Sequence, residues 1–138
     1  MIKVQKKDFN LEKEINDIKD NLKSVGAVCS FIGYVRDLNN NKIVKGIDLE
    51  VYREMAISEL SSIKKTAIEK WGLADCLIIH RYGKLNISEK IVLVACFSKH
   101  RKESEEACQY IMDYLKKDAP FWKKEFYREG SSWLKNTS

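Results

Sequence analysis

The chain has 138 residues, of which 44% are hydrophobic and 33% charged, and its formal net charge is +5. These values are typical of a soluble globular protein, and we expect one domain over residues 1–138 that needs no disulfide or metal to stabilise its core. The longest apolar run, residues 91–97, is far below the roughly 20 residues of a membrane span, and no signal peptide is visible, so we expect a cytoplasmic protein without a membrane partner.

The cysteines and histidines give no metal motif. No pair of cysteines has C-x-x-C spacing, and the chain has only two histidines. We therefore predict no metal and no cofactor, and we interpret the cysteines as free, structural thiols, none of them placed to act as a sulfur carrier. They are Cys29, Cys76, Cys96 and Cys108.

The first third of the chain alternates strand and helix patterns. Residues 2–6 alternate weakly, which favours an edge strand, and apolar residues at helical spacing over 11–22 predict an amphipathic helix with Asn10 as its N-cap. Residues 25–35 are nearly all apolar and rich in β-branched and aromatic side chains. This run predicts a central strand covered on both faces, which ends at Arg36.

A polar stretch, a strand and a long helix follow. Residues 37–42, DLNNNK, predict a mobile loop without packing residues. The alternation over 43–52 predicts a strand, and the apolar spacing over 54–71 predicts a helix that ends at Gly72.

The last part of the chain adds strands and a third helix. Residues 74–80 and 90–98 are predicted strands joined by an irregular connection, and a helix then runs toward Pro120, the only proline. The tail after Pro120 predicts a strand, a turn and a strand about Gly130. Strands joined by hairpins thus coexist with strands separated by helices. This order predicts an α+β fold with a mixed or mainly antiparallel sheet and about three packed helices.

Three basic residues lie at strand ends. Arg36 follows a buried-looking strand, where it is either a solvated side chain or a fork-shaped donor for phosphate or carboxylate. His100 and Arg101 lie where a strand meets a helix start, and unpaired backbone N–H groups attract anions there. A helix-end histidine beside a surface arginine is the alternative interpretation.

Lysines cluster on both sides of Pro120. Lys116 ends the helix, and the turn at Pro120 is expected to bring Lys123 and Lys124 back beside it. Crowding by other cations favours a neutral, reactive amine, whereas the alternative is a solvated basic face. We expect this segment, together with His100 and Arg101, to surround one concavity that binds an anionic substrate.

Several motifs in this order resemble the catalytic (large) subunit of molybdopterin synthase. They are GAVCSFIGYVRD, LEVYREMA, IIHRYGKL, the apolar strand into SKHR, and MDYLKKDAPFWKKE. The resemblance spans about residues 26–133 and implies an α+β hammerhead-like fold.

The resemblance also implies a reaction. Members of this family are sulfurtransferases of molybdenum cofactor biosynthesis, which take cyclic pyranopterin monophosphate and install the two dithiolene sulfurs of molybdopterin. The sulfur arrives as a thiocarboxylate on the C-terminal Gly-Gly tail of a small ubiquitin-like subunit, and no metal is required. The large subunits form a homodimer within a heterotetramer, and a pocket can include residues from the neighbouring protomer.

The resemblance also assigns catalytic and substrate-binding roles to residues of this chain. By resemblance, Lys116 is the central catalytic residue, as acid/base or as amine partner of the thiocarboxylate, and Lys123 assists it. The substrate would be held by Arg36, His100 and Arg101, with Tyr34 and Val35 lining the approach and Lys124 and Glu125 flanking Lys123.

Two other hypotheses belong to different classes of function. A basic α+β module could bind single-stranded nucleic acid on Phe121, Trp122 and Tyr127, although the net charge is small and these aromatics are close enough to Pro120 to serve as turn anchors. An inactive scaffold could bind a ubiquitin-like protein without chemistry, but the lysine pair argues against it. We therefore expect no nucleic-acid partner.

Overall fold

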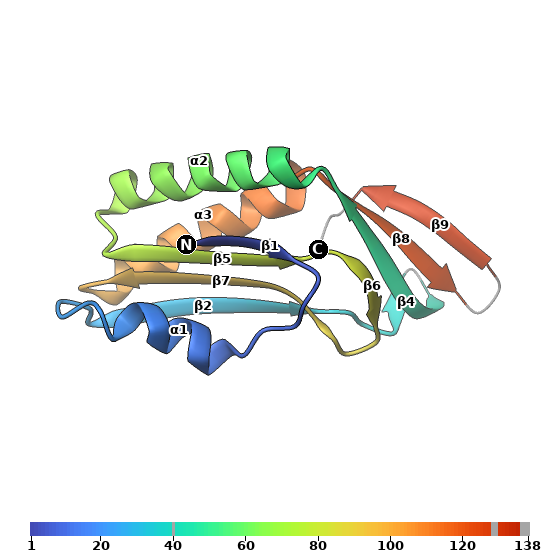
Figure 1. Cartoon of the computed structure of the whole chain (residues 1–138), viewed down its shortest axis with the longest axis horizontal. Helices are drawn as coiled ribbons and strands as arrows, with labels where there is room; N and C mark the ends of the chain where they lie inside the picture. The colour runs from blue at the N-terminus through green and yellow to red at the C-terminus, as the bar shows by residue number, and fades with distance from the viewer. Residues whose placement is uncertain (40, 128–129, 136–138) are drawn as a thin grey trace.

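The computed structural model describes residues 1–39, 41–127 and 130–135, with side chains up to residue 127. Three helices and nine strands lie in this part of the chain (Figure 1). The helices are α1 (Leu11–Lys19), α2 (Arg53–Trp71) and α3 (Arg101–Lys117). The strands are β1 (Ile2–Gln5), β2 (Ala27–Tyr34), β3 (Leu38–Asn39), β4 (Lys42–Val51), β5 (Asp75–Arg81), β6 (Gly83–Asn86), β7 (Lys90–Ser98), β8 (Phe121–Tyr127) and β9 (Gly130–Lys135).

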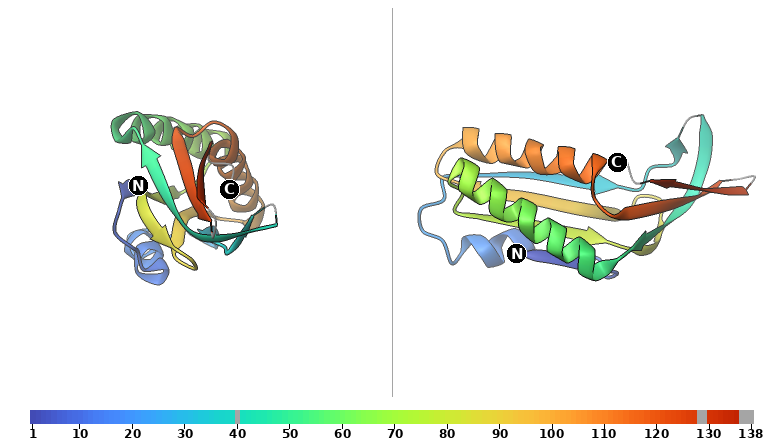
Figure 2. Two further views of the ribbon diagram at one scale, coloured as in Figure 1. Left: turned by 90° about the vertical axis from the view of Figure 1, so that its right-hand side faces the viewer. Right: turned by 90° about the horizontal axis from the view of Figure 1, so that it is seen from above.

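A four-stranded sheet forms the body of the molecule. Its strand order is β1-β5-β7-β2, with β1 parallel to β5 and the other pairs antiparallel. Helices α2 and α3 lie side by side over one face, and α1 covers the other (Figures 1 and 2). Alternate residues of β5 and β7 therefore point into two different cores, as expected for strands covered on both faces.

A second sheet extends from one end of the body. Its order is β3-β4-β8-β9, and β6 pairs with β4 on the same sheet. The long strand β4 leads from this sheet directly into α2, and β8 returns into it after α3 (Figure 1). The end of α3 and the start of β8 thus meet at the junction between the two sheets.

The helix boundaries follow from local signals that the sequence carries. The side chain of Asn10 accepts a hydrogen bond from the backbone N–H of Lys13 at 2.9 Å, as an N-cap should. Gly72 ends α2 in the left-handed conformation, with φ of 60°. Helix α3 ends at Lys117, three residues before Pro120, which lacks the N–H that another turn would need.

The predicted α+β class, the mainly antiparallel pairing and the three helices are confirmed. The interpretation of residues 25–35 as a central strand was wrong, because β2 is an edge strand with Val28, Phe31 and Tyr34 at least 36% exposed. An apolar run reports how apolar a strand is, but it does not report the position of that strand in the sheet.

Two stretches predicted as irregular contain strands. Leu38 and Asn39 form β3, which pairs with Lys42 and Ile43, so the polar stretch is part of a hairpin with β4. The connection carrying Gly83 is strand β6. The tail forms the expected pair of strands, β8 and β9. Gly130, about which the turn was predicted, is the first residue of β9, and residues 128–129 lie outside the described residues. None of the helices in the described part of the chain has the length and apolar character needed to span a membrane.

Candidate active site

A pocket of about 330 Å³ opens at the junction of the two sheets. The chain segment leaving β2 forms one wall, the last turn of α3 forms another, and β4 and β8 form the floor. Its lining combines cations with apolar side chains: Tyr34, Val35, Arg36, Asn39, Ile47, Ile91, Lys116, Lys123 and Glu125.

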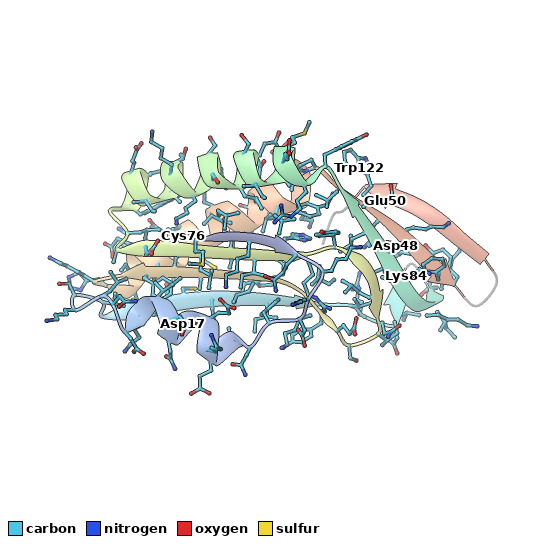
Figure 3. The ribbon with its side chains drawn as sticks, in the orientation of Figure 1. Asp17, Asp48, Glu50, Cys76, Lys84 and Trp122 are labelled. Carbon is cyan, nitrogen blue, oxygen red and sulfur yellow. The ribbon has the colours of Figure 1, made fainter. Side chains whose placement is uncertain are left out.

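The turn after α3 places the two lysines in this pocket. Ala119 and Pro120 are buried, and Phe121 is fully buried, so the chain is anchored where it changes direction into β8. Side chains alternate between the two faces of a strand, so Lys123 and Glu125 share the pocket face of β8. Trp122 points to the other face, where it lies beside Glu50 of β4 (Figure 3).

Glu125 is the most heavily bonded residue of the pocket. Its side chain is 4% exposed, and it accepts hydrogen bonds from Asn39 Nδ2 at 2.8 and 3.0 Å and from the hydroxyl of Tyr127 at 2.6 Å. Lys123 Nζ lies 3.5 Å from Glu125 Oε2. Burial raises the pKa of Glu125, but the hydrogen bonds and the Lys123 charge together outweigh burial and lower it. The carboxylate is therefore ionised at neutral pH.

The two lysines of the pocket differ in their surroundings. The Lys123 side chain is 14% exposed and ion-paired with Glu125. Lys116 is solvent-exposed, and no carboxylate among residues 1–39 and 41–127 forms an ion pair with it. The pocket thus contains one fixed cation and one accessible amine, with the Arg36 guanidinium on the same lining. This arrangement attracts an anion and presents an amine to it.

The structure brings together six of the nine residues predicted from the sequence. They are Tyr34, Val35, Arg36, Lys116, Lys123 and Glu125. Lys124 does not line the pocket, because it is on the opposite face of β8 from Lys123, with its amine 5.5 Å from the ring centroid of Phe126.

His100 and Arg101 were expected around the same concavity, but within one protomer they lie far from this pocket. His100 is the N-cap of α3 and Arg101 its first residue, whereas Lys116 lies in its last turn. At 1.5 Å per residue, roughly 22 Å of helix separates Arg101 from Lys116. Both residues are exposed at the opposite end of the body.

Sequence reasoning missed four residues of this region. Ile47 and Ile91 line the pocket, but they look like ordinary core positions of apolar strands. Asn39 and Tyr127 bond to Glu125 across 86 and 2 residues of sequence, respectively. The period-2 pattern of β8 places Tyr127 on the same face as Glu125, and that signal was available. Nothing local in DLNNNK indicates that Asn39 reaches β8.

The aromatic residues proposed to stack on nucleic-acid bases make contacts within the protein instead. Phe121 is fully buried, Trp122 packs edge-on against Tyr52 with centroids 5.6 Å apart, and Tyr127 donates its hydroxyl to Glu125. Three bases could not stack on them in succession. In the part of the chain that the structure describes, no group of three or more His, Cys, Asp or Glu side chains is placed to hold a metal ion.

Comparison with protein-family models gives one match that covers most of the chain. The matching model describes the MoaE protein and covers residues 4–118. The match begins inside β1 and runs to the end of α3.

Curated relatives are similar over nearly the whole length. The molybdopterin synthase catalytic subunit of Ralstonia nicotianae is 47% identical over 96% of this chain and 76% of its own. The protein of the same name from Pseudomonas aeruginosa is 43% identical over 96% of this chain and 89% of its own.

Solved structures share the fold. The MoaE protein of Burkholderia ambifaria superposes with a TM-score of 0.86 at 37% identity, over 100% of this chain and 90% of that one. Molybdopterin synthase from Staphylococcus aureus gives a TM-score of 0.87 at 32% identity, over 96% and 95% of the two chains.

Proposed function

The chain belongs to the MoaE protein family, and from that premise we propose how its pocket performs the sulfur transfer of a molybdopterin synthase. Its function is that of the catalytic subunit of this synthase, a sulfur-transferring enzyme of molybdenum cofactor biosynthesis. We propose cyclic pyranopterin monophosphate as the substrate of the pocket, and the molybdopterin dithiolene as the product.

The observation that carries the proposal is the convergence of Arg36, Lys116 and Lys123 on one pocket. These three cations come from the end of β2, the end of α3 and the middle of β8, so the fold must form before they meet. Sulfur transfer to a phosphorylated pterin develops negative charge on oxygen, and fixed cations stabilise that charge. The apolar side chains of Ile47 and Ile91 offer a surface for a flat ring beside them.

The two lysines take different roles. Lys116, exposed and without an ion-pair partner in the described residues, is the amine that meets the incoming thiocarboxylate or exchanges protons with the reacting groups. Lys123, held by Glu125, is the fixed cation that assists it. The Arg36 guanidinium binds an anionic group of the substrate with its planar set of donors.

The sulfur donor is a second protein. We propose a small ubiquitin-like subunit whose C-terminal Gly-Gly thiocarboxylate enters the pocket beside Lys116. A glycine tail has no side chains to clash with the pocket wall, and holding it next to the pterin replaces a bimolecular encounter with an oriented one. Tyr34, 52% exposed, lines the same pocket from the end of β2.

The edge strand β2 explains how His100 and Arg101 can serve the pocket. The first residue of β2, Ala27, pairs with Ser98 at the end of β7, so that end of β2 lies beside the start of α3. The last residue, Tyr34, is in the pocket. When two copies align their β2 edges antiparallel about a two-fold axis, the strand start of one copy meets the strand end of the other.

We therefore propose a homodimer in which the second copy supplies His100 and Arg101. The exposed side chains of Val28 and Phe31 on β2 would be covered in this arrangement, which removes an apolar sheet edge from water. The pocket remains at the outer end of each copy, so one small subunit can bind at each end of a heterotetramer. We place this assembly in the cytoplasm, and four free cysteines are consistent with a reducing compartment.

Reconstitution tests this function. The purified chain is mixed with a small subunit carrying a C-terminal thiocarboxylate and with cyclic pyranopterin monophosphate, and dithiolene formation is measured. We expect product only when the thiocarboxylate is present, and none with the unmodified Gly-Gly carboxylate. A chain that binds the small subunit and precursor but forms no product would refute the proposal.

A further inference from the structure

We propose that Asn39 and Tyr127 are positioning residues that act through Glu125 to fix the ammonium group of Lys123 in the pocket. This inference rests on the proposed function of Lys123. It assigns roles to a residue of the β3–β4 hairpin and to the last residue of β8, neither of which needs to touch the reacting atoms.

The contacts around Glu125 leave its carboxylate little freedom. Asn39 Nδ2 donates to both oxygens, at 2.8 and 3.0 Å, and the Tyr127 hydroxyl donates to Oε1 at 2.6 Å. Lys123 approaches Oε2, at 3.5 Å. The carboxylate is held from both sides, so the ion pair keeps the Lys123 amine on the pocket side of β8. A buried carboxylate without these donors would be costly to keep charged.

The same two residues connect the hairpin to β8. Asn39 reaches Glu125 from β3, and Lys42 at the start of β4 lies with its amine 5.2 Å from the ring centroid of Tyr127. Two neighbouring positions of the hairpin thus contact two positions of β8. Since Asn39 also lines the pocket, the wall formed by the hairpin is tied to the residue that holds Lys123.

The charged groups around Glu125 decide how pH acts on this network. Lys123 and Tyr127 face it from β8 and Asn39 from β3, while Arg36 and Lys116 are the other charged groups of the pocket lining. Every one of these groups is a cation or a hydrogen-bond donor. Removing a donor therefore raises the pKa of Glu125 toward the value that burial favours, and the carboxylate becomes protonated at a higher pH.

The test combines a carboxyl titration with kinetics on the complete assembly. The variants are Asn39→Ala and Tyr127→Phe, the second of which keeps a ring for Lys42. The matched control is Tyr114→Phe, which removes a tyrosine–glutamate hydrogen bond of 2.8 Å, to Glu59, away from the pocket lining. Carbon-13 NMR of labelled glutamate, with Glu125→Gln for assignment, follows the titration of Glu125 without any turnover.

We expect both variants to raise the pKa of Glu125 and to lower kcat about tenfold, with KM for the precursor nearly unchanged. The acid limb of the kcat profile should move to higher pH by the same amount, and Tyr114→Phe should move neither. An unchanged Glu125 titration in both variants would overturn the inference, as would a loss of activity that is uniform across pH. The titration needs no reaction, so it tests this inference even if the proposed function fails. A failure of the proposed function would show instead as a wild-type chain that forms no product.

Discussion

The imidazole of His80 and the ring of Phe121 stack face to face, with centroids 3.7 Å apart and an interplanar angle of 17°. His80 lies in β5 of the first sheet, and Phe121 is the first residue of β8, two positions before Lys123. His80 Nδ1 lies 2.8 Å from the carbonyl oxygen of Arg81, which can only accept, so Nδ1 carries the proton of the neutral ring. This stack fixes the start of the strand that carries Lys123.

Acid should weaken the fold through His80. Burial lowers the pKa of His80 from 6.5 to about 4, so below pH 6.5 the unfolded chain binds a proton that the folded chain does not. The stability contributed by the neutral ring is fully present above pH 6.5 and is lost between about pH 6.5 and 4, up to about 3 kcal/mol. Urea unfolding of the wild type and of His80→Phe across this range measures it. The variant keeps a stacked ring and should lose that part of the pH dependence; identical pH profiles for the two chains would contradict the assignment.

Replacing Lys116 should remove catalysis and leave the fold intact. The side chain is exposed in the last turn of α3, and surface substitutions of this kind change the free energy of unfolding by about 0.5 kcal/mol or less. We expect Lys116→Ala to lower product formation at least 100-fold, since an acid/base or nucleophilic group of this kind contributes on the order of 100-fold or more.

The neighbouring lysine provides the control for that experiment. Lys117 has the same charge and exposure on the same turn but does not line the pocket, so Lys117→Ala should keep nearly full activity. Circular dichroism and the unfolding midpoint verify that both variants are folded. Turnover by Lys116→Ala at a rate close to that of Lys117→Ala would remove Lys116 from its assigned role.

The sequence predicted the parts of this site that depend on short-range patterns. The turn at Pro120 brought Lys116 and Lys123 together in the prediction, but it placed Lys124 beside them as well, and Glu125 was included only through the family resemblance. The edge position of β2 could not be predicted in this way, because the order of strands in a sheet is a property of long-range pairing. The hydrogen bond from Asn39 to Glu125 could not be predicted either, because it joins residues 86 positions apart in the sequence.

Substituting Gly26 should displace the segment that carries His100 and Arg101. A Cβ on Gly26 would overlap with the carbonyl oxygen of Lys99, which is backbone and cannot swing aside. We expect Gly26→Ala to destabilise the fold by about 1–3 kcal/mol, the usual cost of an overpacked site. Gly72→Ala is the comparison: it meets no atom within 4 Å, and its left-handed φ of 60° alone should cost about 1 kcal/mol. Thermal unfolding ranks the stability of the two variants. A smaller loss of stability for Gly26→Ala than for Gly72→Ala would contradict the predicted overlap with Lys99.

Two inactive variants should restore activity to each other if Arg101 acts across the dimer. In a mixed dimer of Lys116→Ala and Arg101→Ala, one pocket lacks both side chains. The other pocket has Lys116 from the Arg101→Ala copy and Arg101 from the Lys116→Ala copy. Each variant alone is expected to be inactive. Random mixing by co-expression should give about a quarter of the wild-type activity, because half of the dimers are mixed and each has one complete pocket. If Arg101 instead serves its own protomer, every pocket in the mixture lacks one residue and no activity returns. As a control, Phe31→Glu is added to both variants and places a charge on the exposed β2 edge. These chains should remain monomeric and should regain no activity when mixed.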